Sequence, residues 1–94
     1  MNIITTKIKE IELNEKILLL KCRDINFNIK IINGTIDIIV KTTSKDIVSY
    51  TYLEKNDIIK VMYNKNNNEN IPIKIYVNTK YTFNSESEDS ETLI

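Results

Sequence analysis

The stretch that decides the fold class is Ile25-Asn-Phe-Asn-Ile-Lys-Ile-Ile-Asn33-Gly34-Thr-Ile-Asp-Ile-Ile-Val-Lys-Thr42. Its two halves alternate apolar and polar residues, which is typical of half-buried β-strands. Asn33-Gly34 between them is typical of a type I′ turn, because both central residues of that turn have positive φ. The stretch therefore predicts one β-hairpin from Ile25 to Thr42.

The turn also predicts the register of this hairpin. Pairing outward from it places apolar residues opposite one another on one face, in the pairs Ile31–Ile36, Ile29–Ile38 and Phe27–Val40. On the other face we expect Lys30 opposite Asp37, as a cross-strand pair of opposite charge. The same outer face would expose Ile39.

The rest of the chain also favours strands. Residues 3–13 fit a helical stripe as well, but Thr5, Thr6 and the Ile content favour a strand that is interrupted near Glu10 by a bulge or turn. Further strands are expected at 17–23, 47–53, 58–63 and 71–83. Turns are expected at 13–16, 43–46 and 54–57, and a polar loop at 64–70. In the last strand the odd positions would face the core, with Pro72 at a strand start or an edge.

These segments predict an all-β protein: a small antiparallel barrel or sandwich of about six strands. Residues 1–83 would form a single β domain, because the chain is too short for two. Residues 84–94 have no hydrophobic periodicity, so we expect a disordered acidic tail.

Composition excludes most enzyme classes. The chain has 19 Ile, 13 Asn and 12 Lys, a bias typical of an AT-rich genome, but it has no His and only one Gly and one Cys. There is thus no Ser-His or Cys-His pair, no zinc ligand set and no Gly-rich phosphate loop. We expect no enzyme, no catalytic residue, no metal and no cofactor, and Cys22 is expected as a buried core residue.

No apolar run approaches the length of a membrane span, and the first residues do not resemble a signal peptide. A soluble, intracellular protein is expected, in cytoplasm or nucleus and without a membrane partner. The formal net charge of zero is the sum of two unlike parts: residues 1–83 carry +4 and residues 84–94 carry −4. A basic body with an acidic tail is typical of proteins that bind polyanions or basic partners.

The candidate site combines aromatic and basic residues on a β surface. Lys74, Tyr76 and Lys80 would project from the last strand, opposite its Ile row, where Tyr could stack on a base while Lys meets phosphates. Lys60, Tyr63 and Lys65 precede them on the neighbouring strand and loop. These six residues predict a surface for single-stranded nucleic acid.

The segment from Tyr50 to Val61, Tyr-Thr-Tyr-Leu-Glu-Lys-Asn-Asp-Ile-Ile-Lys-Val, followed by a polar loop and a long strand, resembles the second half of OB-fold single-stranded nucleic-acid-binding proteins. Asn56 stands where that family usually has Gly, and 42–53 reads as extended where the family has a helix. The resemblance implies that the hairpin 25–42 matches the family's strands 2 and 3. It also implies that the tail is an extension that recruits partners and competes with nucleic acid.

The tail and the surface leave alternatives open. The last four residues fit a C-terminal motif that binds beside a sheet edge of a partner protein; they are Glu91, Thr92, Leu93 and Ile94. Alternatively, the tail only increases solubility. The alternative to nucleic-acid binding is an oligomeric barrel or sandwich that acts in protein assembly, resembling nucleoplasmin-type chaperones. That homo-oligomer would use exposed apolar residues such as Ile39.

Overall fold

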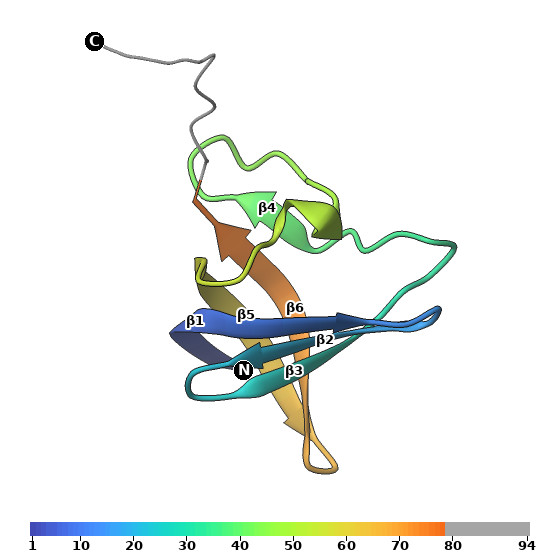
Figure 1. Cartoon of the computed structure of the whole chain (residues 1–94). Coiled ribbons are helices and arrows are strands. Elements are labelled where there is room, and N and C mark those ends of the chain that lie inside the picture. The colour runs from blue at the N-terminus through green and yellow to red at the C-terminus, as the bar shows by residue number, and fades with distance from the viewer. Residues whose placement is uncertain (79–94) are drawn as a thin grey trace, which may run out of the picture.

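The computed structural model describes residues 1–78 of the 94. Six strands form one mixed sheet in the order β3-β2-β1-β5-β6-β4 (Figure 1). The elements are β1 (Asn2–Leu13), β2 (Ile17–Cys22), β3 (Asn26–Lys30), β4 (Ile39–Lys41), the 3-10 turn η1 (Tyr50–Tyr52), β5 (Ile58–Asn66) and β6 (Glu69–Val77). The all-β class and the number of strands predicted from the sequence are confirmed, whereas the expected disordered tail lies outside the described residues.

β1 is the strand that joins the two halves of the sheet. Its first part pairs with β5 from Asn2 to Lys7, and its second part pairs with β2 from Ile8 to Leu13. The register shifts between Ile8 and Glu10, so the interruption predicted near Glu10 is a β-bulge. A bulge bends its strand and increases its twist, which lets β1 serve both halves of a curved sheet (Figure 1).

The core lies inside this curved sheet. Its fully buried side chains come from all six strands and include Phe27, Ile8, Leu18, Leu20, Ile39, Ile59, Ile75, Val61 and Val77. Thr6 is the one buried polar residue among those described. Its hydroxyl donates a hydrogen bond to Asp24 Oδ2 over 3.2 Å, so this buried group is satisfied and ties β1 to the turn between β2 and β3.

The predicted hairpin from Ile25 to Thr42 is wrong beyond its turn. Asn33 and Gly34 do have positive φ, 53° and 76°, and Ile32 and Thr35 exchange both backbone hydrogen bonds. The pairing ends there, because β3 pairs with β2 and β4 pairs in parallel with β6. The predicted pairs Ile31–Ile36, Ile29–Ile38 and Phe27–Val40 do not form, and Lys30 lies opposite Ile17 instead of Asp37.

Burial explains why the two predicted arms separate. In the predicted hairpin Ile39 would face solvent, but beside Ile75 of β6 it is 0% exposed, and Val40 beside Tyr76 is 5% exposed. The chain gains this apolar burial by leaving β3 after the turn. Ile39 is therefore not the exposed apolar residue on which the assembly hypothesis relied.

The strand predicted at 47–53 is also wrong. Ile47 makes an isolated bridge to Val40, and the following residues form η1, where Ser49 accepts a hydrogen bond from Thr51 N. Lys41 N donates to Asp46 O and Val48 N donates to Ile39 O, each over 2.9 Å. This segment thus covers the outer edge of β4.

The polar loop predicted at 64–70 is a continuation of two strands. β5 runs to Asn66 and β6 starts at Glu69, with only Asn67 and Asn68 between them, at φ 50° and 67°. Two consecutive positive φ values define a type I′ turn, and Asn adopts them more easily than other residues with a side chain. The turn was not predicted because the surrounding residues are also Asn-rich and polar, which is typical of a loop.

The inward pattern predicted for the last strand holds for only part of β6. Ile75 and Val77 are buried, as predicted, but Ile71 and Ile73 are 41% and 40% exposed. The cause is a register shift opposite Met62 and Tyr63, where Pro72 takes the buried place. The other turns agree with the sequence: Asn14 Oδ1 accepts from Lys16 N and Ile17 N, and Asn56 has φ 77°.

Gly34 supplies the first prediction. A Cβ at this position would meet no atom within 4 Å, so a substitution costs only backbone strain. We expect Gly34→Val to lower the free energy of unfolding by about 1–2 kcal/mol, measured by urea denaturation. Gly34→Asn is the control and should cost less, since Asn tolerates positive φ; equal stability of the wild type and the Val variant would refute the turn assignment.

Cys22 supplies the second prediction. Burial, and then the negative charge of Asp24, raise the pKa of its thiol to about 11 from 9.0. At pH 8 we expect the folded protein to react with a disulfide reagent about 100-fold more slowly than the unfolded chain, because the thiolate is the reactive form. Reaction at the same rate in both states would contradict the buried placement.

The same shift makes stability depend on pH. A raised pKa favours the protonated native state, so this contribution is complete below pH 9 and is lost as pH rises through 11. The free energy of unfolding of the wild type should therefore fall more between pH 9 and 11 than that of Cys22→Ala. This comparison isolates the contribution of the Cys22 thiol.

Candidate nucleic-acid interface

The outer face of the β5–β6 hairpin brings three of the predicted site residues together. Because side chains alternate along a strand, Ile59 and Val61 of β5 face the core while Lys60 faces outward. On β6, Ile75 and Val77 face the core while Lys74 and Tyr76 face outward. Lys60 lies directly opposite Tyr76, and Lys74 lies opposite Met62.

Tyr76 is the centre of this face. Its ring is half-buried, and its hydroxyl contacts Met62 Sδ over 3.8 Å. The ammonium of Lys45 lies 5.3 Å from the ring centroid, a distance at which a cation is attracted to the ring. Lys45 is held there by a positive φ of 64° and by a hydrogen bond from its Nζ to Thr42 O over 2.7 Å.

We call Lys45, Lys60, Lys74 and Tyr76 the Tyr76 face. Within residues 1–78 none of its three lysines takes part in an ion pair, since the ion pairs there involve only Lys21 and Arg23. Among the described residues, the Tyr76 face is thus a basic surface with no carboxylate in an ion pair with its lysines.

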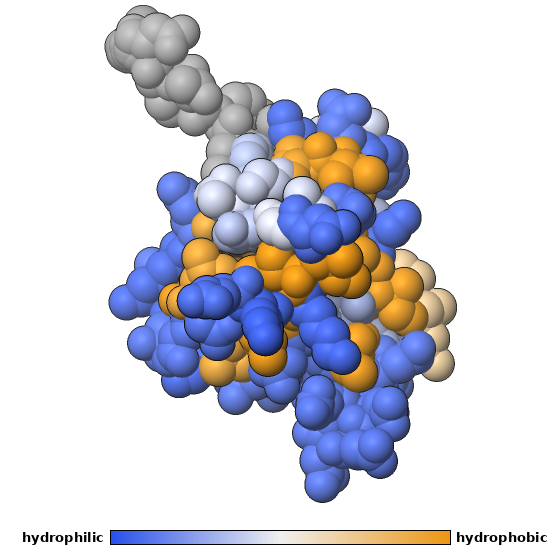
Figure 2. Space-filling model, turned by 90° about the vertical axis from the view of Figure 1, so that its right-hand side faces the viewer, coloured by the Kyte–Doolittle hydropathy of each residue, from blue (hydrophilic) through white to orange (hydrophobic). Residues whose placement is uncertain are grey.

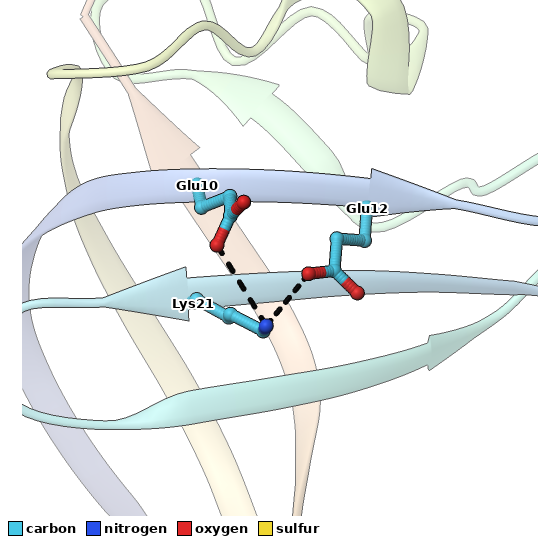
Figure 3. Close-up of polar contacts among 3 residues, drawn as sticks. All are labelled: Glu10, Glu12 and Lys21. Carbon is cyan, nitrogen blue, oxygen red and sulfur yellow. Dashed lines mark hydrogen bonds and ion pairs between the residues drawn. The ribbon is translucent and has the colours of Figure 1, made fainter.

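The opposite case is the ion-pair cluster on β1 and β2. Lys21 Nζ lies 2.6 Å from Glu12 Oε2 and 3.7 Å from Glu10 Oε1, and Figure 3 shows the two carboxylates of β1 converging on this ammonium of β2. The hydrogen bond with Glu12 and its charge raise the pKa of Lys21 above its usual value. Because Lys21 is neutralised in this way, this side of the sheet offers little attraction to a polyanion.

Tyr63 and Lys65 do not belong to the Tyr76 face. Alternation along β5 places Tyr63 on the core side with Ile59 and Val61, where its ring meets Phe27 edge to face at 5.3 Å between centroids. Lys65 lines a polar groove of about 530 Å³ together with Asp24 and Glu69. The alternation Ile59, Val61, Tyr63 is the sequence signal for this separation, and the expectation of a loop at 64–70 led to the wrong grouping.

The other predicted site residues belong to the last part of the chain. Lys80 and the tail residues Glu91, Thr92, Leu93 and Ile94 lie outside the described residues. Residues 1–78 contain no group of three or more His, Cys, Asp or Glu side chains placed to hold a metal ion. Within the same range there is also no helix with the length and apolar character that a membrane crossing requires.

A second, apolar groove was missed by the sequence analysis. It has a volume of about 610 Å³ and lies between β3 with the segment that follows it and the first half of β6. Asn28 and Glu69 line both grooves, so the two adjoin. The predicted hairpin left no room for the apolar groove, because residues 36–38 were expected to pair with β3 at the place where the groove lies.

Comparison with protein-family models, with curated proteins and with solved structures finds no match to this chain.

Proposed function

We propose that this chain is a non-enzymatic OB-like module that binds single-stranded nucleic acid, without sequence preference, on its Tyr76 face. The observation that carries the proposal is the position of Tyr76 among Lys45, Lys60 and Lys74, none of which has an ion-pair partner within residues 1–78. Aromatic side chains that accept stacked bases beside lysines that contact phosphates are the usual means of sequence-independent binding.

The strand order supports the OB-like part of the proposal. If β3 and β4 are counted as two halves of one interrupted strand, the first strand pairs with the second and the fourth, and the third closes on the fifth. An OB-fold is a five-stranded, partly open Greek-key barrel. η1 also lies between the third and fourth strands, where the family has a helix, and β2–β3 rather than 25–42 would be the family's second and third strands.

The contacts of the Tyr76 face suggest how a single strand of nucleic acid would bind. Phosphates would meet Lys60 and Lys74, whose exposed side chains lie on adjacent strands. A base that stacks on Tyr76 would displace the ammonium of Lys45 from the ring, and Lys45 would then be available to a further phosphate. The ring itself would move little, because Met62 and the strand pairing hold it.

Charge favours the Tyr76 face over the grooves. The apolar groove has Lys30 against Asp37 and Glu69, and the polar groove has Lys65 against Asp24 and Glu69. Each groove thus carries one more acid than base, which opposes a polyanion. This assigns Lys60, Lys74 and Tyr76 to the proposed site, and leaves Tyr63 and Lys65 beside it.

The acidic tail would act on the same face. Its four carboxylates, Glu86, Glu88, Asp89 and Glu91, balance the charge of the body, so we propose that it competes with nucleic acid for the lysines. This competition is electrostatic and should weaken as salt screens the charges. Its C-terminal residues remain a proposed motif for a partner protein.

Substitution of Lys60 and Lys74 tests where on the molecule the nucleic acid binds. With a labelled single strand of about 20 nucleotides, the full-length chain should bind with a salt slope of about −2, because Lys45, Lys60 and Lys74 would each neutralise one phosphate. Lys60→Glu/Lys74→Glu should abolish binding, measured by fluorescence anisotropy at low salt.

The matched control is Lys30→Glu/Lys65→Glu, which makes the same change in net charge but lies in the grooves. It should retain most of the affinity. Loss of binding in the control alone would move the site to the grooves, and absence of binding by the wild type at low salt would overturn the proposed function.

Tyr76 supplies a prediction about stacking. Tyr76→Leu keeps an apolar side chain against Met62 but removes the ring, and should cost about 1–3 kcal/mol of binding free energy. Tyr76→Phe keeps the ring and loses only the hydroxyl contact with Met62, so its affinity should match the wild type. If Leu and Phe variants bind equally well, the affinity does not come from stacking on this ring.

A further inference from the structure

The apolar groove lies between β3 and the first half of β6, two neighbouring strands that share no hydrogen-bonded ladder among the described residues. Among the described residues β3 pairs with β2 alone. β6 has β5 along its whole length, but β4 lies beside only its last residues, Ile75 to Val77. The edge of β3 and the edge of the first half of β6 therefore face the groove without a ladder between them.

The edge of β3 presents backbone groups in the spacing of a strand. Residues of an antiparallel pair alternate between pointing their N–H and C=O at the partner and away from it. Ile31 N donates to Lys16 O, and Cys22 N donates to Ile25 O, so the odd residues here face β2. Asn28 and Lys30 consequently direct their N–H and C=O toward the groove.

One contact across the gap agrees with this alternation. Asn70 Nδ2 of β6 donates to the carbonyl of Asn26 over 3.2 Å, and Asn26 is an even residue of β3. This hydrogen bond closes one end of the gap, and the apolar groove begins beyond it. On the β6 side Pro72 has no N–H to offer, so β3 is the better partner for an added strand.

Branched apolar side chains form the wall of the groove. They are Ile17, Ile32, Ile36, Ile38, Ile71 and Pro72. Ile32 is 67% exposed, Ile71 41% and Ile17 38%, an unusual concentration of exposed Ile for one surface. Figure 2 shows apolar side chains gathered on this side of the molecule, where the turn after β1 and the Asn33-Gly34 turn lie.

The charged side chains of the apolar groove indicate which kind of ligand it binds. The charged side chains of the groove are Lys30, Asp37 and Glu69, and neither carboxylate forms an ion pair within residues 1–78. The net charge is negative, which opposes nucleic acid and complements a basic side chain. Backbone edge, apolar wall and acidic rim together fit an extended peptide that alternates branched apolar with basic or polar residues.

We infer that the apolar groove binds such a peptide segment of a partner protein, which adds to the free edge of β3 as a further strand. Its N–H and C=O groups pair with those of Asn28 and Lys30. Its apolar side chains pack on Ile17, Ile32 and Ile71, and its lysine or arginine approaches Asp37 and Glu69. This site is separate from the Tyr76 face and does not depend on the proposed function.

The probe for this inference is the fluorescent peptide acetyl-Thr-Lys-Val-Thr-Ile-Lys-Val-Thr-amide, titrated with the full-length chain. We expect saturable binding, and slower amide hydrogen exchange at Asn28 and Lys30 in the bound protein. The amide of Ile29 is the internal control, since it already faces β2 and should not change. The same peptide with Glu in place of Lys should bind at least tenfold more weakly.

Variants locate the site. Ile32→Lys should weaken peptide binding at least tenfold, and Ile47→Lys is the matched control, because Ile47 is 63% exposed but lies beside β4. Asp37→Lys is a second variant that tests the charge without changing the apolar wall. Both groove variants should leave binding to the labelled single strand unchanged, so failure here is distinguishable from failure of the proposed function.

Several results would overturn the inference. They are no binding of the peptide, equal affinity of wild type and Ile32→Lys, or exchange protection elsewhere than at the β3 edge. A wild type that sediments as a dimer which Ile32→Lys dissociates would show that the groove is an interface between copies of this chain. Competition of the peptide by single-stranded DNA at the Ile32 site would assign the groove to nucleic acid.

Discussion

The parallel contact between β4 and β6 is the constraint on which the rest of the structure depends. It is short, from Ile39–Ile75 to Lys41–Val77, yet it holds β4, the last strand of the order, on the sheet. Without it the sheet would have Ile39, Val40, Ile75 and Val77 near a solvent-facing edge, and these four are at most 5% exposed. Hydrogen bonds from Ile75 N to Ile38 O and from Thr42 N to Val77 O hold the junction. Apolar burial thus holds β4 against β6 at this end of the sheet.

Local signals in this sequence predicted turns better than they predicted partners. The positive φ values at Asn33-Gly34, the turns at 13–16 and 54–57 and the bulge near Glu10 followed from residue type and alternation, because each depends on a few neighbouring residues. The partner of each strand depends on the whole core. The alternation in 36–41 is the same whether the segment pairs with β3 or with β6, so the sequence alone could not choose, and the type I′ turn favoured the wrong partner.

The residues of the candidate site also divide into those that local signals could predict and those that they could not. Lys60, Lys74 and Tyr76 share a face because period-two alternation holds through the regular part of β5 and β6. Tyr63 was predicted with them because a loop was expected at 64–70, but β5 continues to Asn66, and its alternation keeps Tyr63 on the core side beside Phe27. Lys45 was not predicted at all, since it comes from a loop that reaches Tyr76 only after β4 has docked on β6. Residues placed by one hairpin were predictable, and residues placed by the docking of β4 on β6 were not.

The pairing with β6 that buries Ile39 also leaves the edge of β3 without a strand ladder among the described residues. Had residues 36–41 paired with β3, the backbone groups of Asn28 and Lys30 would have been satisfied within the chain, and no groove would exist. Because this segment leaves to pair with β6, β3 keeps an unpaired edge beside Ile32 and Ile71. Natural sheets usually protect such an edge with charges, a proline or a covering segment. Here Lys30, Pro72 and the Asn26–Asn70 contact give only partial protection. An edge that is left open in this way, next to an apolar wall, is better explained by binding of an added strand than by stability of the isolated domain.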